Sequence, residues 1–242
     1  MKNYLAITLA FGVSICLAQQ TTPIKKSISI NSTSFEYHES LIESKSVVLV
    51  FHDWFGISDL SFEMLQRINA KGMDAIALDM YKGKSAKTNP EAAKLMNSVD
   101  QANVWDYINK VVDDASQKYD NVFIWGFSLG TQFASQAAIR NNSEVTALIL
   151  FYGNTPQAED QLNKMTFPSL MVMGSKDNPN GAIRFYEALS KGDKTYATLF
   201  IYPNARHAFA QKLFNAGNNY DEEAKKTTFN LAFRFIEENT VR

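Results

Sequence analysis

The sequence predicts an α/β fold with a mostly parallel central sheet and helices on both of its faces. One observation is a set of short, continuous runs of β-branched and apolar residues, such as 46–51 (SVVLVF) and 145–151 (VTALILF). Such runs are typical of strands that are buried on both faces, as in a parallel sheet. A second observation is that these runs alternate with segments of helical periodicity, which indicates repeated strand–helix–strand units.

The predicted elements follow one another in a regular order along the chain. An alternating run at 27–30 predicts an edge strand, and 35–37 predicts its hairpin partner. Further strands are expected at 46–51, 73–78, 122–125, 145–151, 169–173 and 196–202. Helices are expected at 58–70, 90–96, 104–119, 132–140 and 182–189, with a long amphipathic helix at 222–238. No linker or repeat divides residues 19–242, which predicts one domain.

Composition and charge are those of an ordinary globular protein. Hydrophobic residues make up 45% and charged residues 20% of the 242 positions, which allows a substantial core. The net charge is −1 and no basic stripe occurs, so no electrostatic feature predicts nucleic acid or an anionic membrane as a partner. Cys16 is the sole cysteine and precedes the expected domain. The domain is therefore expected to have no disulfide, no cysteine-based metal site and no thiol nucleophile.

The N-terminal residues 1–18 are predicted to be a secretory signal. A lysine precedes an almost wholly apolar run at 4–18, and the polar segment 19–23 follows. This pattern is typical of a signal peptide cleaved near Ala18, and the run is shorter than the ~20 residues that span a bilayer. The sequence therefore predicts a periplasmic or secreted protein that is not held in a membrane after cleavage. An uncleaved membrane anchor is the alternative.

The pentapeptide GFSLG at 126–130 is the most informative motif in the chain. It follows the expected strand 122–125 and precedes the expected helix 132–140. A G-x-S-x-G in this setting is typical of a nucleophile elbow, a sharp turn in which small residues relieve crowding around an exposed serine hydroxyl. Ser128 is therefore the predicted nucleophile. The alternative is a helix N-cap in which this serine accepts a backbone N–H.

A serine hydroxyl needs a base within hydrogen-bond reach, and the chain offers three histidines. His207 lies in the loop after the last expected strand, where open α/β sheets place their chemistry. His52 precedes the serine in the chain, and His38 lies in the predicted hairpin. Asp177 follows another expected strand and is predicted to orient the imidazole. The alternative is that this aspartate is an ordinary turn residue. The order Ser128, Asp177, His207 is that of α/β-hydrolases.

Acyl transfer also requires donors for the oxyanion. The backbone N–H of Leu129, at the start of the expected helix, is predicted to be one of them. The second is expected from the loop at 52–56 (HDWFG), which follows the strand 46–51. Such a site requires no metal and no organic cofactor.

With these motifs in place, the sequence resembles the dienelactone hydrolase family of α/β-hydrolases. The matching segments are HDWFG (52–56), DMY (79–81), GFSLG (126–130), GSKD (174–177) and RHAFA (206–210). The resemblance covers most of residues 19–242 and implies an α/β-hydrolase fold that acts on small esters or lactones. It also implies that Trp54 supplies the second oxyanion N–H.

Three departures from the family pattern bear on the substrate. The enzyme that names the family has a cysteine nucleophile, and this chain has Ser128. Asp53 stands where that enzyme has a glutamate that interacts with the thiol. The arginines that the family uses to hold the substrate carboxylate are missing: Gly83 and Gln211 stand near those positions, although Lys82 and Lys84 lie close by. These departures favour a broader serine esterase over hydrolysis of dienelactone itself.

Five loop residues beside the expected site are candidate substrate contacts: Asp53, Tyr81, Lys82, Tyr152 and Phe209. Each has an ordinary alternative role. The aspartate can cap its own loop, the lysine can be a solvated surface residue, and aromatic residues near strand ends often belong to the core.

The sequence therefore predicts an exported serine hydrolase that cleaves small carboxylic esters or lactones through an acyl-enzyme. Two other functions stay open. One is a peptidase or acyl-sugar deacetylase on the same fold, and the other is a catalytically silent binding protein on a hydrolase scaffold. Loss of a triad residue would be the signature of the silent protein, and the sequence shows no such loss.

Overall fold

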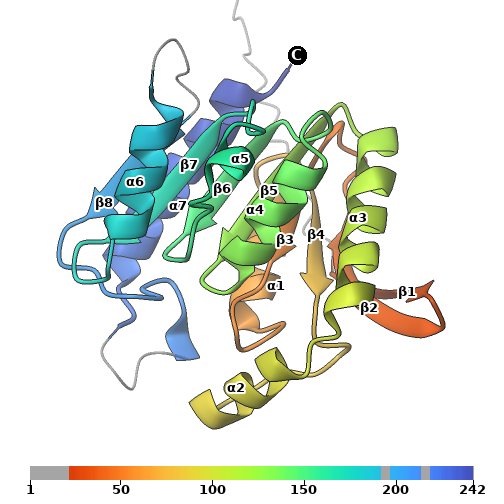
Figure 1. Ribbon diagram of the computed structural model, residues 1–242. Helices are drawn as coiled ribbons and strands as arrows, with labels where there is room; N and C mark the ends of the chain where they lie inside the picture. The colour runs from red at the N-terminus through yellow and green to blue at the C-terminus, as the bar shows by residue number, and fades with distance from the viewer. Residues whose placement is uncertain (1–21, 192–196, 214–218, 242) are drawn as a thin grey trace, which may run out of the picture.

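The strands form one eight-stranded sheet in the order β1-β2-β4-β3-β5-β6-β7-β8 (Figure 1). This computed structural model describes residues 22–191, 197–213 and 219–241, so the predicted signal at 1–18 lies outside the described residues. The strands are β1 (Ile24–Ile30), β2 (Thr33–Ser40), β3 (Ser46–Phe51), β4 (Asp74–Asp79), β5 (Asn121–Phe127), β6 (Ala147–Phe151), β7 (Ser169–Gly174) and β8 (Ala197–Tyr202). β2 pairs antiparallel with both β1 and β4, and the neighbours from β4 through β3 to β8 all pair parallel, which confirms the predicted fold class.

Helices cover both faces of the sheet. α3 (Gln101–Lys118), α4 (Gly130–Arg140) and α6 (Asn180–Leu189) lie in front of it in Figure 1, and α1 (Asp59–Asn69) and α7 (Glu222–Asn239) lie behind. α2 (Asn89–Asn97) lies below the ends of the strands in the same view. The short α5 (Glu159–Leu162) was not predicted, because four residues with no buried side chain carry no periodic signal. In the described ranges, no helix combines the length and apolarity needed to cross a bilayer.

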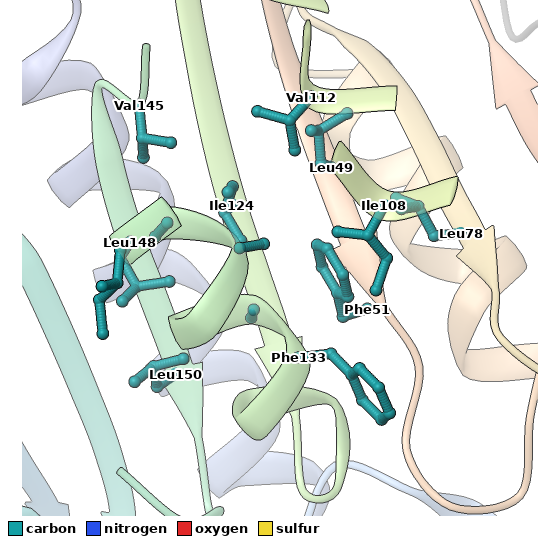
Figure 2. Close-up of a cluster of buried hydrophobic side chains, with 14 of the residues drawn as sticks. Leu49, Phe51, Leu78, Ile108, Val112, Ile124, Phe133, Val145, Leu148 and Leu150 are labelled. Atoms are coloured by element: carbon teal, nitrogen blue, oxygen red, sulfur yellow. The ribbon is translucent and has the colours of Figure 1, made fainter. Parts of the chain in front are cut away.

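Two large apolar clusters fill the spaces on either side of the sheet. Figure 2 shows the cluster on the side of α3 and α4, where Leu49, Ile124 and Leu148 point away from their strands toward the helices. Their chain neighbours Val48 and Phe123 belong to the cluster on the side of α1 and α7. Successive side chains of a strand point to opposite faces, so a strand with helices on both sides must be apolar at every position. This explains the continuous apolar runs in the sequence.

Side-chain caps decide where several helices begin. The carboxylate of Asp100 accepts the backbone N–H of Asn103 (3.3 Å), and that of Asp221 accepts the N–H of Ala224 (2.9 Å). Capping satisfies backbone donors that the first turn leaves without partners. α3 therefore begins at Gln101, three residues before the expected start, because the aspartate that caps it lies outside the apolar periodicity.

The sheet has its topological switch point at β3. The chain passes from β3 to β4 on one side and later returns to β5 on the other. Loops that leave the carboxyl ends of strands on either side of such a point diverge, and the crevice between them is where open α/β sheets bind ligands. The loop after β3 holds the segment 52–56, and the turn after β5 holds the predicted nucleophile Ser128.

Candidate active site

Ser128 stands directly after β5 in a strained backbone conformation, with φ of +49°. Its backbone N–H still donates to the carbonyl of Phe151 (2.9 Å), which extends the β5–β6 ladder by one step. The chain then turns at once into α4, which begins at Gly130. Left-handed φ at a residue other than glycine, asparagine or aspartate is uncommon and often marks a functional site. The geometry is that of the predicted elbow.

The two glycines of the motif are required by close approach of the backbone. A Cβ at Gly126 would lie 2.7 Å from the Cβ of Ala134 on α4. A Cβ at Gly130 would lie 2.4 Å from the carbonyl oxygens of both Phe51 and His52, at the end of β3. α4 can therefore start against β5 and β3 only because these side chains are absent.

Two residues that sequence reasoning did not single out complete the elbow. The hydroxyl of Thr131 donates to the carbonyl oxygens of Ser128 (2.8 Å) and Asn154 (2.7 Å), which ties the elbow to the loop after β6. A Cβ at Gly153 would lie 2.2 Å from the Thr131 Oγ1 and 2.3 Å from the Ser128 carbonyl oxygen. A glycine soon after a buried strand was the only available signal for this contact.

The structure brings the three predicted triad residues together in one hydrogen-bonded chain. The Oγ of Ser128 lies 2.8 Å from Nε2 of His207, and Nδ1 of that ring lies 2.8 Å from Oδ2 of Asp177. Burial by itself would raise the pKa of Asp177, but the hydrogen bond and charge of His207 and the N–H of Asn178 hold it below its usual value. The carboxylate is therefore ionised at neutral pH and accepts the proton of Nδ1, which leaves Nε2 free to accept from the serine hydroxyl.

Contacts between the loops after β7 and β8 hold the acid and the base side by side. The N–H of Lys176 donates to the carbonyl of Ala205 (2.9 Å), and the N–H of Asn204 donates to the hydroxyl of Ser175 (2.8 Å). A Cβ at Gly174 would lie 2.4 Å from the Ala205 carbonyl oxygen, so the glycine allows this approach. Neighbouring parallel strands thus deliver Asp177 and His207 to the same edge of the sheet.

Leu129 and Trp54 lie where the oxyanion donors were expected. Leu129 directly precedes α4, and within the described part of the chain its backbone N–H donates no hydrogen bond. The first N–H groups of a helix carry partial positive charge, which suits an oxyanion. Trp54 lies in the loop after β3, and its carbonyl accepts the hydroxyl of Tyr81 (3.1 Å). Both residues line the cavity that contains Ser128 and His207.

This cavity has a volume of about 440 Å³ and opens at the carboxyl ends of the strands. α2 lies across that end of the sheet in Figure 1 and contributes Asn89 and Met96 to the wall. The cavity is lined by Trp54, Asn89, Met96, Ser128, Leu129, Gln132, Gly153, Asn154 and His207. Across the described ranges, no three side chains of His, Cys, Asp or Glu gather in a group that could hold a metal ion.

Asp53 is buried and engaged within the protein, and it does not line this cavity. One carboxylate oxygen accepts the N–H of Phe55 (2.9 Å), and the other accepts Nε2 of Gln211 (2.7 Å), which also donates to the hydroxyl of Ser58 (3.2 Å). Burial raises the pKa of Asp53 above its usual value. The pair ties the loop after β3 to the loop that carries His207. No local pattern could pair two residues 158 positions apart.

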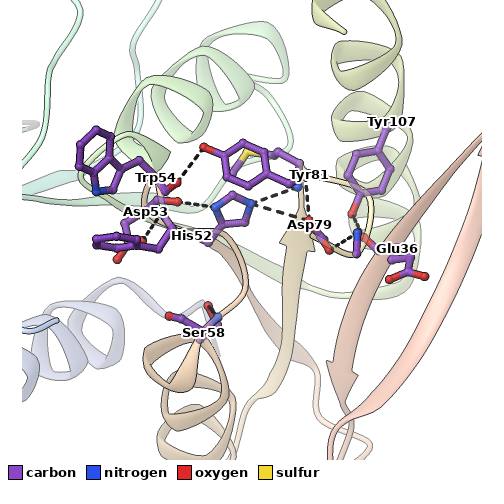
Figure 3. A network of polar contacts seen from close by, with 12 residues as sticks. Glu36, His52, Asp53, Trp54, Ser58, Asp79, Tyr81 and Tyr107 are labelled. Carbon is purple, nitrogen blue, oxygen red and sulfur yellow. Dashed lines mark hydrogen bonds and ion pairs between the residues drawn. The ribbon is translucent and has the colours of Figure 1, made fainter. Parts of the chain in front are cut away.

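His52 is a buried link between loops. Figure 3 shows its imidazole between the loops after β3 and β4, where Nδ1 donates to the carbonyl of Asp53 (2.6 Å) and Nε2 accepts the N–H of Met80 (3.1 Å). These partners allow only the neutral ring, and burial lowers the pKa of His52 to about 4. The ring holds the start of the loop that carries Trp54.

Tyr81 and Lys82 follow β4 and are absent from the lining of the cavity that holds Ser128. The Tyr81 hydroxyl donates to Trp54, as Figure 3 shows, and the side chain is nearly buried. Lys82 is exposed, and its ammonium lies over the ring of Phe35, 5.1 Å from the centroid. Through its hydroxyl, Tyr81 supports the loop that carries Trp54.

Tyr152 and Phe209 pack beside the base. Tyr152 follows β6 with φ of +41°, and its ring lies edge-on to His207 (5.7 Å between centroids) and to Phe209 (5.0 Å). Tyr152 lines a second cavity of about 550 Å³, to which Asp177 and His207 also contribute. Phe209 is fully buried in the cluster on the side of α7. Of the five candidate substrate contacts, Tyr152 is the one that reaches a cavity shared with the triad residues.

The sheet order, the elbow after β5 and the loops after β7 and β8 together define an α/β-hydrolase. Solved structures with this fold superpose over nearly the whole chain. The dienelactone hydrolase-like promiscuous phosphotriesterase P91, from metagenomic libraries, has a TM-score of 0.73 at 19% identity and covers 91% of this chain and 99% of its own. Est1E from Butyrivibrio proteoclasticus, solved with ferulic acid bound, has a TM-score of 0.68 at 17% identity and covers 88% and 98%.

The chain belongs to the Dienelactone hydrolase family, which matches residues 37–240. The Aquifex aeolicus (strain VF5) protein named "Putative carboxymethylenebutenolidase" is 29% identical over 203 residues, or 78% of this chain and 86% of that protein. The resemblance inferred from the motifs is thus confirmed. The protein is a hydrolase of the dienelactone hydrolase type.

Proposed function

We propose that the protein is a serine hydrolase that cleaves small carboxylic esters or lactones with Ser128 as nucleophile, His207 as base and Asp177 as the orienting acid. The observation that carries the proposal is the unbroken hydrogen-bonded chain from the serine hydroxyl to the carboxylate, with both links at 2.8 Å. A neutral imidazole with Nε2 toward the hydroxyl is the state that accepts the proton.

The reaction proceeds in two half-reactions. The Ser128 oxygen attacks the ester carbonyl as His207 takes its proton, and the carbonyl oxygen acquires negative charge beside the N–H groups of Leu129 and Trp54. The C–O bond to the alcohol then breaks, and the imidazolium protonates the leaving oxygen. Water, deprotonated by the same imidazole, attacks the acyl-enzyme and releases the acid with regeneration of the serine. Asp177 stabilises the imidazolium in both halves.

The engagement of Gln211 supports a broader esterase over an enzyme selective for dienelactone. This residue is 2% exposed and uses its amide on Asp53, Ser58 and the N–H of Leu213. It has no capacity left to hold a substrate carboxylate. A carboxylate on the substrate would therefore have no cationic partner at that position.

The test is covalent labelling by a fluorophosphonate, which reacts with activated serines. The wild-type protein is expected to be labelled, Ser128→Ala to lose the label, and Ser116→Ala on α3 to keep it. Asp177→Asn is expected to lower kcat on p-nitrophenyl acetate by about 10⁴-fold, because the imidazole loses its fixed tautomer. Labelling that persists in Ser128→Ala would overturn the assignment of the nucleophile.

We also propose that the protein is exported and that residues 1–18 are removed near Ala18. The apolar run at 4–18 and the polar segment after it support this. Mass spectrometry of protein recovered from the periplasm or the medium of expressing cells is expected to find a chain that begins near residue 19. Recovery of the uncleaved chain in the cell membrane would contradict the proposal.

A further inference from the structure

The two cavities described above adjoin a third one around the elbow. The central cavity contains Ser128 and His207, and a third cavity of about 420 Å³ lies between α4 and the start of α3. The central and third cavities share the lining residues Met96, Leu129, Gln132 and Asn154. A substrate held at the serine can therefore extend directly into the third cavity, which we call the α3–α4 groove.

The positions of the base and the oxyanion donor decide which part of an ester enters which cavity. The base must protonate the leaving alcohol, so the alcohol lies on the side of His207. The second cavity is lined by His207 and Asp177 but not by Leu129. The α3–α4 groove is lined by Leu129 but not by His207. The acyl group, which stays attached to the serine after the alcohol departs, therefore points into the α3–α4 groove.

The α3–α4 groove has an apolar floor and no formal charge. Its floor includes Trp105 and Phe133, whose ring centroids lie 5.4 Å apart, together with Val99 and Pro156. The polar side chains that line it are neutral amides and hydroxyls, with no Asp, Glu, Lys, Arg or His among them. The guanidinium of Arg140 lies over the Trp105 ring, 4.6 Å from its centroid, but no charged side chain lines the groove itself. A charged acyl group would lose hydration there, whereas apolar carbon would gain from burial.

We propose, on the basis of the proposed function, that the enzyme is specific for esters of uncharged carboxylic acids with an apolar chain or aromatic ring, and that the α3–α4 groove binds this acyl group. The groove is far larger than an acetyl group needs, and its rings suit an aromatic or medium-length aliphatic acid. Gln136 on α4 lines this groove and neither of the other two cavities. A large side chain at this position fills the groove without reaching the serine.

The test compares p-nitrophenyl esters that differ only in the acyl group: acetate, butyrate, hexanoate and the singly ionised glutarate monoester. Full burial of one methylene corresponds to roughly fourfold in kcat/KM, so a half-open groove is expected to give at least about tenfold from acetate to hexanoate. The glutarate monoester is expected to fall at least about tenfold below hexanoate. Equal kcat/KM across the series would overturn the groove assignment.

Two tryptophan variants locate the effect. Gln136→Trp is expected to lower the hexanoate-to-acetate ratio of kcat/KM at least about tenfold, because the indole fills the groove. Gln66→Trp, at an exposed glutamine of α1 outside the three cavities, is the matched control and is expected to keep the ratio. An unchanged hexanoate-to-acetate ratio in Gln136→Trp would overturn the assignment of the groove to the acyl group. Turnover of acetate by the same variant would still support the proposed function. Absence of turnover on every ester, with no fluorophosphonate label, would overturn both.

Discussion

The close approach of α4 to β3 leads to a quantitative prediction for Gly130→Ala. The added Cβ would lie 2.4 Å from two backbone carbonyl oxygens, whereas ordinary contact begins at 3.4 Å. Both obstacles are backbone atoms, so the start of α4 and the end of β3 must separate by about 1 Å. Ser128 and Leu129 directly precede Gly130, and the loop with Trp54 directly follows β3. The separation therefore widens the oxyanion site.

A misplacement of this size is expected to lower kcat/KM on p-nitrophenyl acetate by about 100-fold. Overpacking is expected to lower the free energy of unfolding, measured with urea, by about 1–3 kcal/mol. Gly72→Ala is the matched control: its φ of +81° is strained for alanine, but no atom lies within 4 Å of the added Cβ, and the residue lies in the turn after α1.

Gly72→Ala is expected to lose about 1 kcal/mol of stability and to keep its kcat/KM. The comparison separates loss of stability from damage to the site. If Gly130→Ala hydrolysed the ester at the wild-type rate under conditions where it is fully folded, the reasoning from backbone contact would be refuted.

Two further predictions concern stability. Because burial lowers the pKa of His52 from 6.5 to about 4, its contribution to stability is complete above pH 6.5 and is lost as the pH falls toward 4. The free energy of unfolding should therefore fall across that range by up to about 3 kcal/mol more in the wild type than in His52→Gln. Urea unfolding at several pH values measures this difference. Equal pH profiles for the two proteins would contradict the prediction. Phe229→Ala, which empties a fully buried position of α7, should lower the free energy of unfolding by about 3–5 kcal/mol. Arg234→Ala, on the exposed face of the same helix, should change it by no more than about 0.5 kcal/mol. Similar losses in the two variants would refute the packing of α7 on the sheet.

The fold was largely predictable because burial on both faces makes the central strands almost wholly apolar, and such runs are visible in the sequence. β3 is buried at all six positions and apolar at every one except Ser46, since helices lie on both sides of it, and it matches the expected bounds. The differences lie at the ends of elements and in one short helix. α5 was missed, and α3 begins earlier than expected because Asp100 caps it.

The candidate site was predictable where its residues lie in short motifs directly after strands. The structure places Ser128 and Asp177 each within hydrogen-bond reach of His207. Residues whose surroundings come from distant segments were not predictable. Asp53 contacts Gln211 rather than the cavity, and the role of Gly153 depends on Thr131 in the first turn of α4.

Strand–helix alternation, the elbow and the identity of the reactive groups can be inferred from the amino-acid sequence alone, because periodicity and local motifs depend on neighbours along the chain. The three-dimensional packing of the chain is needed to learn which loops meet, which polar groups are hydrogen-bonded within the protein and which residues line the α3–α4 groove. These properties arise from contacts between segments distant in the chain, such as Asp53 with Gln211, 158 residues apart, and such contacts form only after the sheet brings the carboxyl ends of its strands to one edge.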